Sequence, residues 1–217
     1  MREAVIVSTA RTGLAKSHRG GFNNTGSAAI SGHAVQHSIK RAGIEPGEVS
    51  EVVMGCGTPQ GTSGNNIGRI AAMKAGCPVT TTGVTVSRHC SSGLNAIATA
   101  AGRIIVDGED IVVGAGVEQI SLSLGGKFSH QVDAELYQQY PGLWMPMIET
   151  ADIVAERYKI SREAQDEYSL ESQRRTAAAQ DAGLFDDEIV PMKTVMIVKD
   201  KETGETSEVD YTVTKDE

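Results

Sequence analysis

Short apolar runs alternate with longer amphipathic segments over the first 121 residues. The apolar runs are rich in β-branched side chains and predict buried strands at 4–7, 51–54, 84–86 and 111–113. Apolar side chains recur at helical spacing between these runs, which predicts helices over 27–42, 67–75 and 91–106. Strands that alternate with helices predict a layered α/β fold with a substantially parallel sheet.

The pattern changes after residue 121. Residues 122–148 contain several glycines and prolines with little periodicity, and predict an irregular connection. Residues 150–182 are strongly helical in character; we expect one helix to open at Thr150 and Ser161 to cap the next. Two strands are predicted within 193–213. We therefore predict two domains, residues 1–121 and 122–217.

Composition and charge exclude several classes of protein. The net charge is −8 and no cluster of Lys and Arg is long enough to follow a phosphate backbone, so we expect no nucleic-acid partner. No apolar run approaches the roughly 20 residues of a membrane-spanning helix, and the start of the chain lacks a signal-peptide layout. The three cysteines show neither pairing nor metal-ligand spacing. These features predict a soluble cytoplasmic protein with reduced thiols and no metal site.

One cysteine, Cys90, lies between the predicted strand at 84–86 and the predicted helix at 91–106. The unpaired N–H groups and partial positive charge of a helix start favour a thiolate, and they can also stabilise an oxyanion. The small residues that follow Cys90 leave its approach open. Such a cysteine suits a nucleophile that accepts an acyl group. A cysteine at a helix start can also be an inert packing residue, and the physical pattern alone leaves both roles open.

The segment around Cys90 carries a family resemblance. Residues 87–97, Ser-Arg-His-Cys-Ser-Ser-Gly-Leu-Asn-Ala-Ile, resemble the nucleophile segment of thiolases, whose pattern is Asn-Arg-x-Cys-(Ser/Gly)-Ser-Gly-Leu. Further stretches agree with that family in order and spacing: 11–22, 64–69, 114–118 and 160–191. The resemblance implies the first αβα half of the thiolase fold in residues 1–121, with Cys90 as nucleophile, and part of the lid domain in 122–217.

The resemblance also implies a reaction. Thiolases cleave a 3-ketoacyl-CoA to acetyl-CoA and a shortened acyl-CoA, as in fatty acid β-oxidation, or run the reverse condensation. Cys90 would attack the keto carbonyl and carry the acyl group until coenzyme A accepts it. Acyl-CoA and coenzyme A are then the substrates, and no metal or redox cofactor is implied. Because residues 64–69 resemble a dimer contact, a homodimer or a dimer of dimers is expected.

One segment, residues 143–147, indicates a subgroup of the thiolases. Residues 143–147 resemble the degradative 3-ketoacyl-CoA thiolases, in which Pro-Met replaces the His-Met of biosynthetic members. This similarity implies that Met147 lines the acyl pocket, although ordinary packing in the lid explains it as well. Gln119-Ile120 replaces the usual Ser-Met of the family and Ile148 replaces a glycine, so the substrate preference can differ from that of the commonest members.

The other catalytic segments of thiolases, Gly-His-Pro, Asn-Glu-x-Phe and Cys-x-Gly, have no counterpart in this sequence. We therefore expect the chain to be a fragment, inactive or nearly so alone, whose missing carboxy-terminal half is a possible partner. The remaining histidines and Cys56 are expected to be structural or surface residues: His18, His33, His37 and His130. Two alternatives stay open, namely a condensing enzyme that resembles ketoacyl synthases, and a non-catalytic subunit or scaffold of thiolase ancestry.

Overall fold

The computed structural model describes residues 2–123 and 132–217. The chain divides into two compact units. The first unit combines Met1–Phe128 with Asp187–Glu217, and the second is Ser129–Asp186. Each unit is described by itself below.

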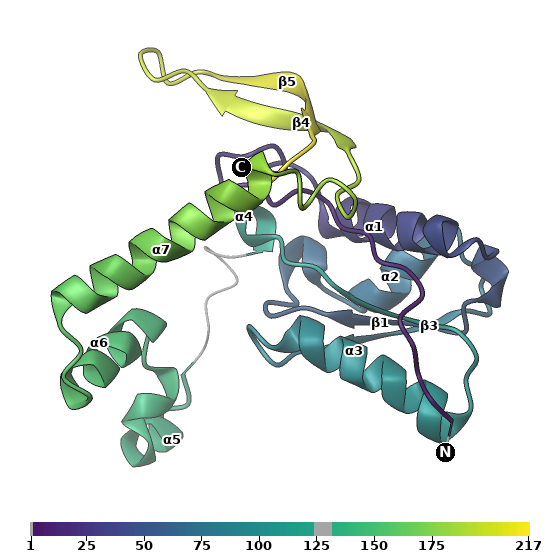
Figure 1. Cartoon of the computed structure of the whole chain (residues 1–217), viewed down its shortest axis with the longest axis horizontal. Helices are drawn as coiled ribbons and strands as arrows, with labels where there is room; N and C mark the ends of the chain where they lie inside the picture. Colours follow the sequence, from purple (N-terminus) through teal and green to yellow (C-terminus); the bar gives the residue numbers. More distant parts are fainter. Residues whose placement is uncertain (1, 124–131) are drawn as a thin grey trace. The chain divides into compact units, whose positions relative to one another are not determined.

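The centre of the first unit is a three-stranded parallel sheet (Figure 1). Its strands are β1 (Glu51–Gly55), β2 (Thr82–Val86) and β3 (Val112–Gly116), in the order β2-β1-β3. Strand β1 is paired on both edges, and every one of its residues is buried. The predicted strands at 51–54, 84–86 and 111–113 and the parallel α/β arrangement are thus confirmed.

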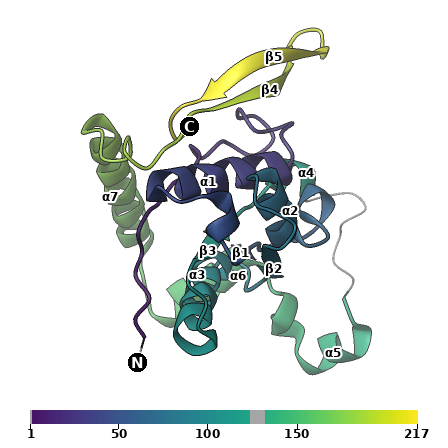
Figure 2. The same ribbon diagram turned by 90° about the vertical axis from the view of Figure 1, so that its right-hand side faces the viewer.

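Helices cover both faces of this sheet (Figure 2). They are α1 (Ser27–Ala42), α2 (Ile67–Lys74) and α3 (Ser92–Gly102), the last continuing as a π-helical segment, η3 (Arg103–Asp107). Neighbouring residues of a strand point to opposite faces, and β1 follows this rule. Val52 and Met54 pack in one core cluster with residues of α1 and α2, whereas Val53 packs in another with residues of α3. The first unit therefore has three layers, helix, sheet and helix.

Shorter elements complete the first unit: η1 (Pro46–Glu48), η2 (Gly61–Ser63), α4 (Ile120–Ser123), β4 (Met192–Lys199) and β5 (Thr206–Val213). Strands β4 and β5 form an antiparallel hairpin. Phe22 packs against Met192 and Val213 in a small core cluster of its own. These contacts join the hairpin to the first unit, whereas the sequence pattern placed it with residues 122–217. Hydrophobic periodicity does not reveal which distant segment a hairpin will pack against.

The strand predicted at residues 4–7 does not form. No regular element is assigned there, and Val5, Ile6 and Val7 are between 72% and 76% exposed. Among the described residues the sheet contains only β2, β1 and β3, and residues 4–7 pair with none of these strands. An apolar run shows that a segment can form a strand, but not that a partner strand is available.

The second unit is helical: its elements are α5 (Ala134–Gln139), η5 (Pro141–Trp144), α6 (Met147–Arg157) and α7 (Arg162–Asp181). Ser161 caps α7 as predicted, because its hydroxyl oxygen accepts a hydrogen bond from the Ala164 N–H at 3.2 Å. Helix α6 begins three residues before the predicted start at Thr150. The prediction of an irregular 122–148 was wrong for α5 and η5, where Asp133 caps a short helix. No helix in the described residues is long and apolar enough to cross a membrane.

Candidate active site

Cys90 lies in the turn that joins β2 to α3. Strand β2 ends at Val86, and α3 begins at Ser92 with Ser91 as its N-cap. The Ser92 hydroxyl fixes this turn, since it accepts from the Arg88 N–H at 2.9 Å and donates to the His89 carbonyl at 2.6 Å. His89 has a positive φ of 47°, which shows how tightly the chain reverses here. Cys90 is exposed at the start of α3, the position that the sequence predicted.

A cavity of about 500 Å³ opens beside Cys90. Its lining comes mainly from residues at the carboxyl ends of β1 and β3 and from the first turn of α3. Ligands of open parallel sheets commonly bind outside this edge. Four of the lining residues are glycines, Gly55, Gly57, Gly93 and Gly116. At Gly55 an added Cβ would collide with the Ser92 backbone, so α3 could not lie this close to β1 with a larger residue there.

Glu118, just beyond β3, contributes a carboxylate to the same cavity. It accepts hydrogen bonds from the Gly57 N–H at 2.7 Å, from the Thr58 N–H at 3.1 Å and from the Thr58 hydroxyl. Cys56 also donates to it, with the sulfur 3.8 Å away. The sequence showed Glu118 only as the last residue of a family motif. Its partners lie about 60 positions earlier, and local pattern gives no signal of so distant a contact.

The other two cysteines are in a different environment. Cys56 and Cys77 are buried in the main core cluster. Burial raises the pKa of the Cys56 thiol, and the nearby Glu118 carboxylate adds to this effect. Burial likewise raises the pKa of Cys77. Both side chains therefore behave as packed thiols, which agrees with the structural role expected for Cys56.

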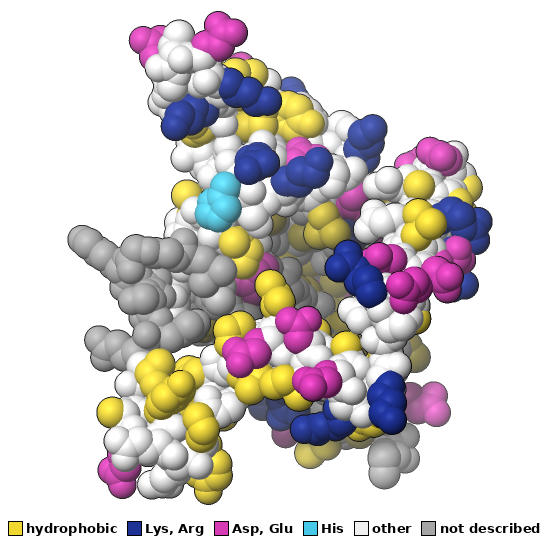
Figure 3. Space-filling view, turned by 90° about the vertical axis from the view of Figure 1, so that its left-hand side faces the viewer, with side chains coloured by type: hydrophobic (Ala, Val, Ile, Leu, Met, Phe, Trp, Pro, Cys, Tyr) yellow, Lys and Arg dark blue, Asp and Glu magenta, His cyan; other side chains and the backbone are white. Residues whose placement is uncertain are grey.

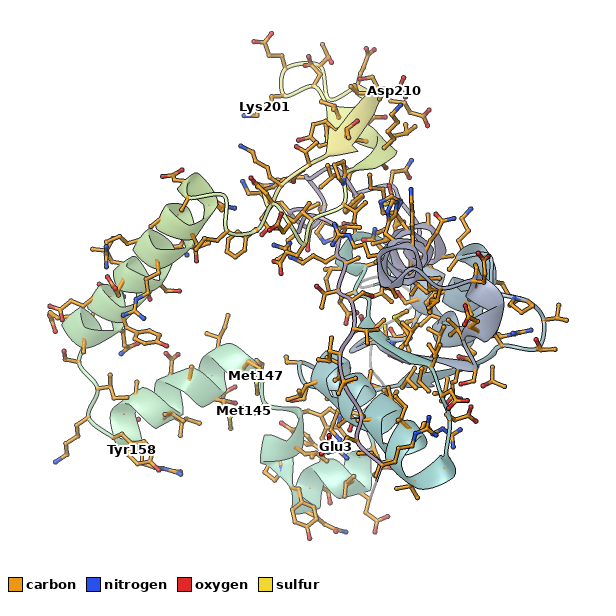
Figure 4. All side chains as sticks on the ribbon, turned by 45° about the vertical axis from the view of Figure 1, so that its right-hand side comes forward. Glu3, Met145, Met147, Tyr158, Lys201 and Asp210 are labelled. Atoms are coloured by element: carbon orange, nitrogen blue, oxygen red, sulfur yellow. The ribbon has the colours of Figure 1, made fainter. Side chains whose placement is uncertain are left out.

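Met147 is the first residue of α6 and belongs to the second unit. Its side chain is 70% exposed at the start of the helix, and Tyr158 follows the other end of α6 (Figure 4). The cavity beside Cys90 is lined by residues of the first unit. A role for Met147 in an acyl pocket therefore stays a prediction.

Three of the remaining histidines are described by the structure. The rings of His33 and His37, one turn apart on α1, lie 4.5 Å apart between centroids. The backbone N–H of His18 donates to the Ser121 hydroxyl. His130 lies outside the described residues. Over residues 2–123 and 132–217, no group of three or more His, Cys, Asp or Glu side chains is arranged to hold a metal ion.

Residues 64–69, which are expected to form a dimer contact, also make hydrogen bonds within their own chain. Asn66 caps α2, because its side-chain oxygen accepts from the Arg69 N–H at 3.3 Å. Its amide nitrogen donates to the Gly83 carbonyl at 2.7 Å, and Arg69 donates to the Val79 carbonyl at 2.9 Å. These bonds hold α2 against β2 and the loop before it. A dimer through residues 64–69 remains a prediction.

The fold and this site define an α/β protein with an exposed cysteine where a helix begins, beside the carboxyl edge of a parallel sheet. Residues 4–217 match the family described as "Thiolase, N-terminal domain", and the chain belongs to the thiolase family.

Known relatives agree with this assignment. The chain is 35% identical over 218 residues to a 3-ketoacyl-CoA thiolase of Bacillus subtilis, covering 100% of this chain and 55% of that protein. It is 39% identical over 204 residues to an acetyl-CoA acetyltransferase of Cupriavidus necator, covering 88% and 51%. The crystal structure of the Bacillus anthracis acetyl-CoA acetyltransferase superposes with a TM-score of 0.78 at 34% identity, covering 98% of this chain and 54% of that one. The chain thus spans about half the length of these relatives.

Proposed function

We propose that Cys90 is the acyl-accepting nucleophile of a thiolase-type acyl transfer between 3-ketoacyl-CoA and coenzyme A. The observation that carries the proposal is the exposed cysteine at the start of α3, open to a cavity lined by glycines. The names of the relatives, 3-ketoacyl-CoA thiolase and acetyl-CoA acetyltransferase, support the substrate class.

The proposed chemistry has two steps. The Cys90 thiolate attacks the 3-keto carbonyl carbon, a C–S bond forms, and the bond between carbons 2 and 3 breaks. Its electron pair leaves on acetyl-CoA, which takes up a proton. The thiolate of coenzyme A then attacks the resulting thioester, a shortened acyl-CoA departs, and Cys90 is released as thiolate. These steps move only electron pairs and protons, so the proposal requires no metal or redox cofactor.

The start of α3 supplies the electrostatics for the first step. A helix start carries a partial positive charge, and α3 begins two residues after Cys90. A negative charge that develops on the attacked oxygen is therefore favoured on this side of the cavity. No lysine, arginine or carboxylate other than Glu118 is among the described residues that line the cavity.

The acid and base groups for the departing enolate are proposed to come from outside these 217 residues. A positioned acid or base contributes about 10²–10⁴-fold to a rate, so the chain alone should turn over very slowly. We further propose that Met147 contacts the acyl chain and that the protein assembles as a homodimer. A cytoplasmic role in fatty acid β-oxidation completes the proposal.

Mass spectrometry tests the nucleophile. Incubation with acetyl-CoA should add one acetyl group to the chain, and peptide mapping should place that group on Cys90. Cys90→Ala should abolish the modification, while Cys77→Ala, which removes a buried thiol, should leave it unchanged. Acetylation that persists in Cys90→Ala, or none in the wild type after long incubation, would contradict the proposal and favour a scaffold role.

A further inference from the structure

Glu118 connects two neighbouring strand ends. The paired last residues of β1 and β3 are Gly55 and Gly116, and Glu118 follows β3 by two residues. Its carboxylate reaches across to the loop that leaves β1. There it accepts from two backbone N–H groups, from one hydroxyl and from the Cys56 thiol. One side chain thus holds three consecutive residues of this loop, 56–58.

The same loop forms one wall of the cavity at Cys90. Gly57 and Thr58 line that cavity together with His89 and Cys90. A Cβ added at Gly57 would lie 2.8 Å from a Glu118 carboxylate oxygen and 3.3 Å from the His89 carbonyl oxygen. Gly57 of this loop therefore lies next to both Glu118 and the backbone of the residue that precedes Cys90. Ser87 strengthens this contact by donating its hydroxyl to the Gly57 carbonyl at 3.4 Å.

We propose that Glu118 is a positioning residue: by binding Gly57 and Thr58 it holds the cavity wall at the distance from Cys90 that orients an incoming acyl thioester. This inference rests on the proposed function of Cys90. Glu118 acts through the loop and transfers no proton in the proposal, since the donors already described occupy its oxygens. Misplacing a reacting group by about 1 Å can cost on the order of 10²-fold in rate, so such a wall has kinetic consequences.

Two reagents separate orientation from simple access. Acetyl-CoA is large and must be oriented, whereas iodoacetamide is small and needs only an accessible sulfur. We expect Glu118→Ala to slow acetylation of Cys90 by about 10–100-fold while alkylation by iodoacetamide changes little. Glu118→Gln keeps the length and one acceptor oxygen, and should recover part of the acetylation rate. Glu208→Ala, which removes an exposed carboxylate on β5, is the matched control and should resemble the wild type in both assays.

One further measurement reports on the cavity wall itself, the loop at residues 56–58. Hydrogen exchange of a peptide covering 56–60 should be faster in Glu118→Ala than in the wild type, because the Gly57 and Thr58 N–H groups lose their acceptor.

Each outcome has a distinct meaning. Unchanged acetylation in Glu118→Ala, an equal loss with both reagents, or unchanged exchange at 56–60 would overturn the positioning role. A wild-type chain that is never acetylated would contradict the proposed function instead. In that case the exchange measurement still decides whether Glu118 holds the loop.

Discussion

Three residues of one type, Cys56, Cys77 and Cys90, show how position controls the reactivity of a side chain. Cys56 and Cys77 are enclosed by the core of the first unit, where burial raises the pKa of each thiol. Cys90 is exposed in a turn before a helix. Reaction with an alkylating agent needs both a thiolate and access to it, and the buried pair lack both. Cys90 should therefore be the reactive thiol of the folded chain.

Alkylation rates can test this difference directly. With iodoacetamide near pH 7.5, Cys90 should react on the order of 10-fold or more faster than Cys56 and Cys77. Peptide mass spectrometry over time gives the three rates in one sample. Denaturant should bring the rates together, since unfolding removes the burial. Similar rates in the native protein would show that the turn at Cys90 does not favour reaction.

An ion-pair network ties distant parts of the first unit together at Arg11. Its guanidinium donates two hydrogen bonds to the Asp216 carboxylate, at 2.7 and 3.0 Å, and one to Glu188 at 2.7 Å. Asp216 is only 17% exposed and also accepts from the Leu14 N–H. The hydrogen bonds from Arg11 lower the pKa of Asp216, so folding favours its charged form.

This pKa shift predicts a dependence of stability on pH. The pKa of Asp216 is lower in the folded state than in the unfolded chain, where it is about 3.9. At acidic pH the unfolded state therefore binds more protons than the folded state does. The stabilisation is complete above about pH 4 to 5 and is lost as the pH falls through the folded pKa. Asp216→Asn should reduce the free energy of unfolding by about 1–3 kcal/mol at pH 7, and by less at pH 3.

Urea unfolding at the two pH values measures this difference. Asp210→Asn, an exposed position on β5, is the matched control and should change stability by less than about 0.5 kcal/mol. A constant effect of Asp216→Asn from pH 7 to pH 3 would contradict the assignment of the shift to this carboxylate.

At the scale of the elements, α2 lies unusually close to β2. Gly68 of α2 faces the strand, and an added Cβ would enter the van der Waals radius of the Val84 backbone. The strand is equally close to the helix, since a Cβ at Gly83 of β2 would lie 2.5 Å from the Cα of Arg69 in α2. Two glycines thus allow backbone to approach backbone, which a larger residue on either side would prevent.

A pair of alanine substitutions tests this packing. Gly68→Ala should lower the free energy of unfolding by about 1–3 kcal/mol, because helix and strand must separate. Gly102→Ala is the matched control: this residue is also helical, with φ near −59°, but a Cβ added there would lie in open space. There the gain in helix propensity should stabilise by about 0.5–1 kcal/mol. Thermal or urea unfolding gives the change in the free energy of unfolding for each variant. Equal changes for Gly68→Ala and Gly102→Ala would refute the close contact between α2 and β2.

The elements also show what a sequence can and cannot predict. The runs at 51–54, 84–86 and 111–113 form strands because each is largely apolar and each has a partner strand. The run at 4–7 is at least as apolar as these three, yet it remains exposed without a partner strand. Strand pairing is a long-range property, so local periodicity predicts strand propensity and not strand membership.

The candidate site also has one part that the sequence predicts and one part that it does not. Cys90 was predictable because a strand end, a helix start and a family motif coincide within a few residues. The bonds from Glu118 to Gly57 and Thr58 were not, since they join the ends of two strands that only the folded sheet brings together.

At the scale of the whole molecule, the two units differ in how much of their regular structure is buried. Strand β1 of the first unit is buried over its full length. Helix α7 of the second unit has no buried residue, and Tyr168 and Leu170 are 81% and 70% exposed. Exposed hydrophobic side chains also lie among charged ones of both signs on the face shown in Figure 3. Regions with few buried apolar contacts open more readily than a core.

Local ion pairs contribute to the stability of α7, and one carboxylate takes part in two of them. Glu171 accepts from Arg174 at 2.7 Å and from Arg175 at 2.7 Å, three and four residues further along the helix. All of these side chains are substantially exposed, so each pair is weak and is screened by salt. Hydrogen exchange should therefore be much faster in α7 than in β1, since local opening of α7 breaks no core contacts.

Removing the shared carboxylate should affect one unit only. Glu171→Gln should accelerate exchange in α7 by about 2–5-fold at low salt, with a smaller effect at high salt, and should leave β1 unchanged. Glu149→Gln, a substitution of the same kind on α6, is the matched control and should leave exchange in α7 unchanged. Equal acceleration in α7 and β1 would mean that the two units open together and that the ion pairs at Glu171 stabilise the whole chain. Acceleration confined to α7 would show that the second unit opens while the core that positions Cys90 stays closed.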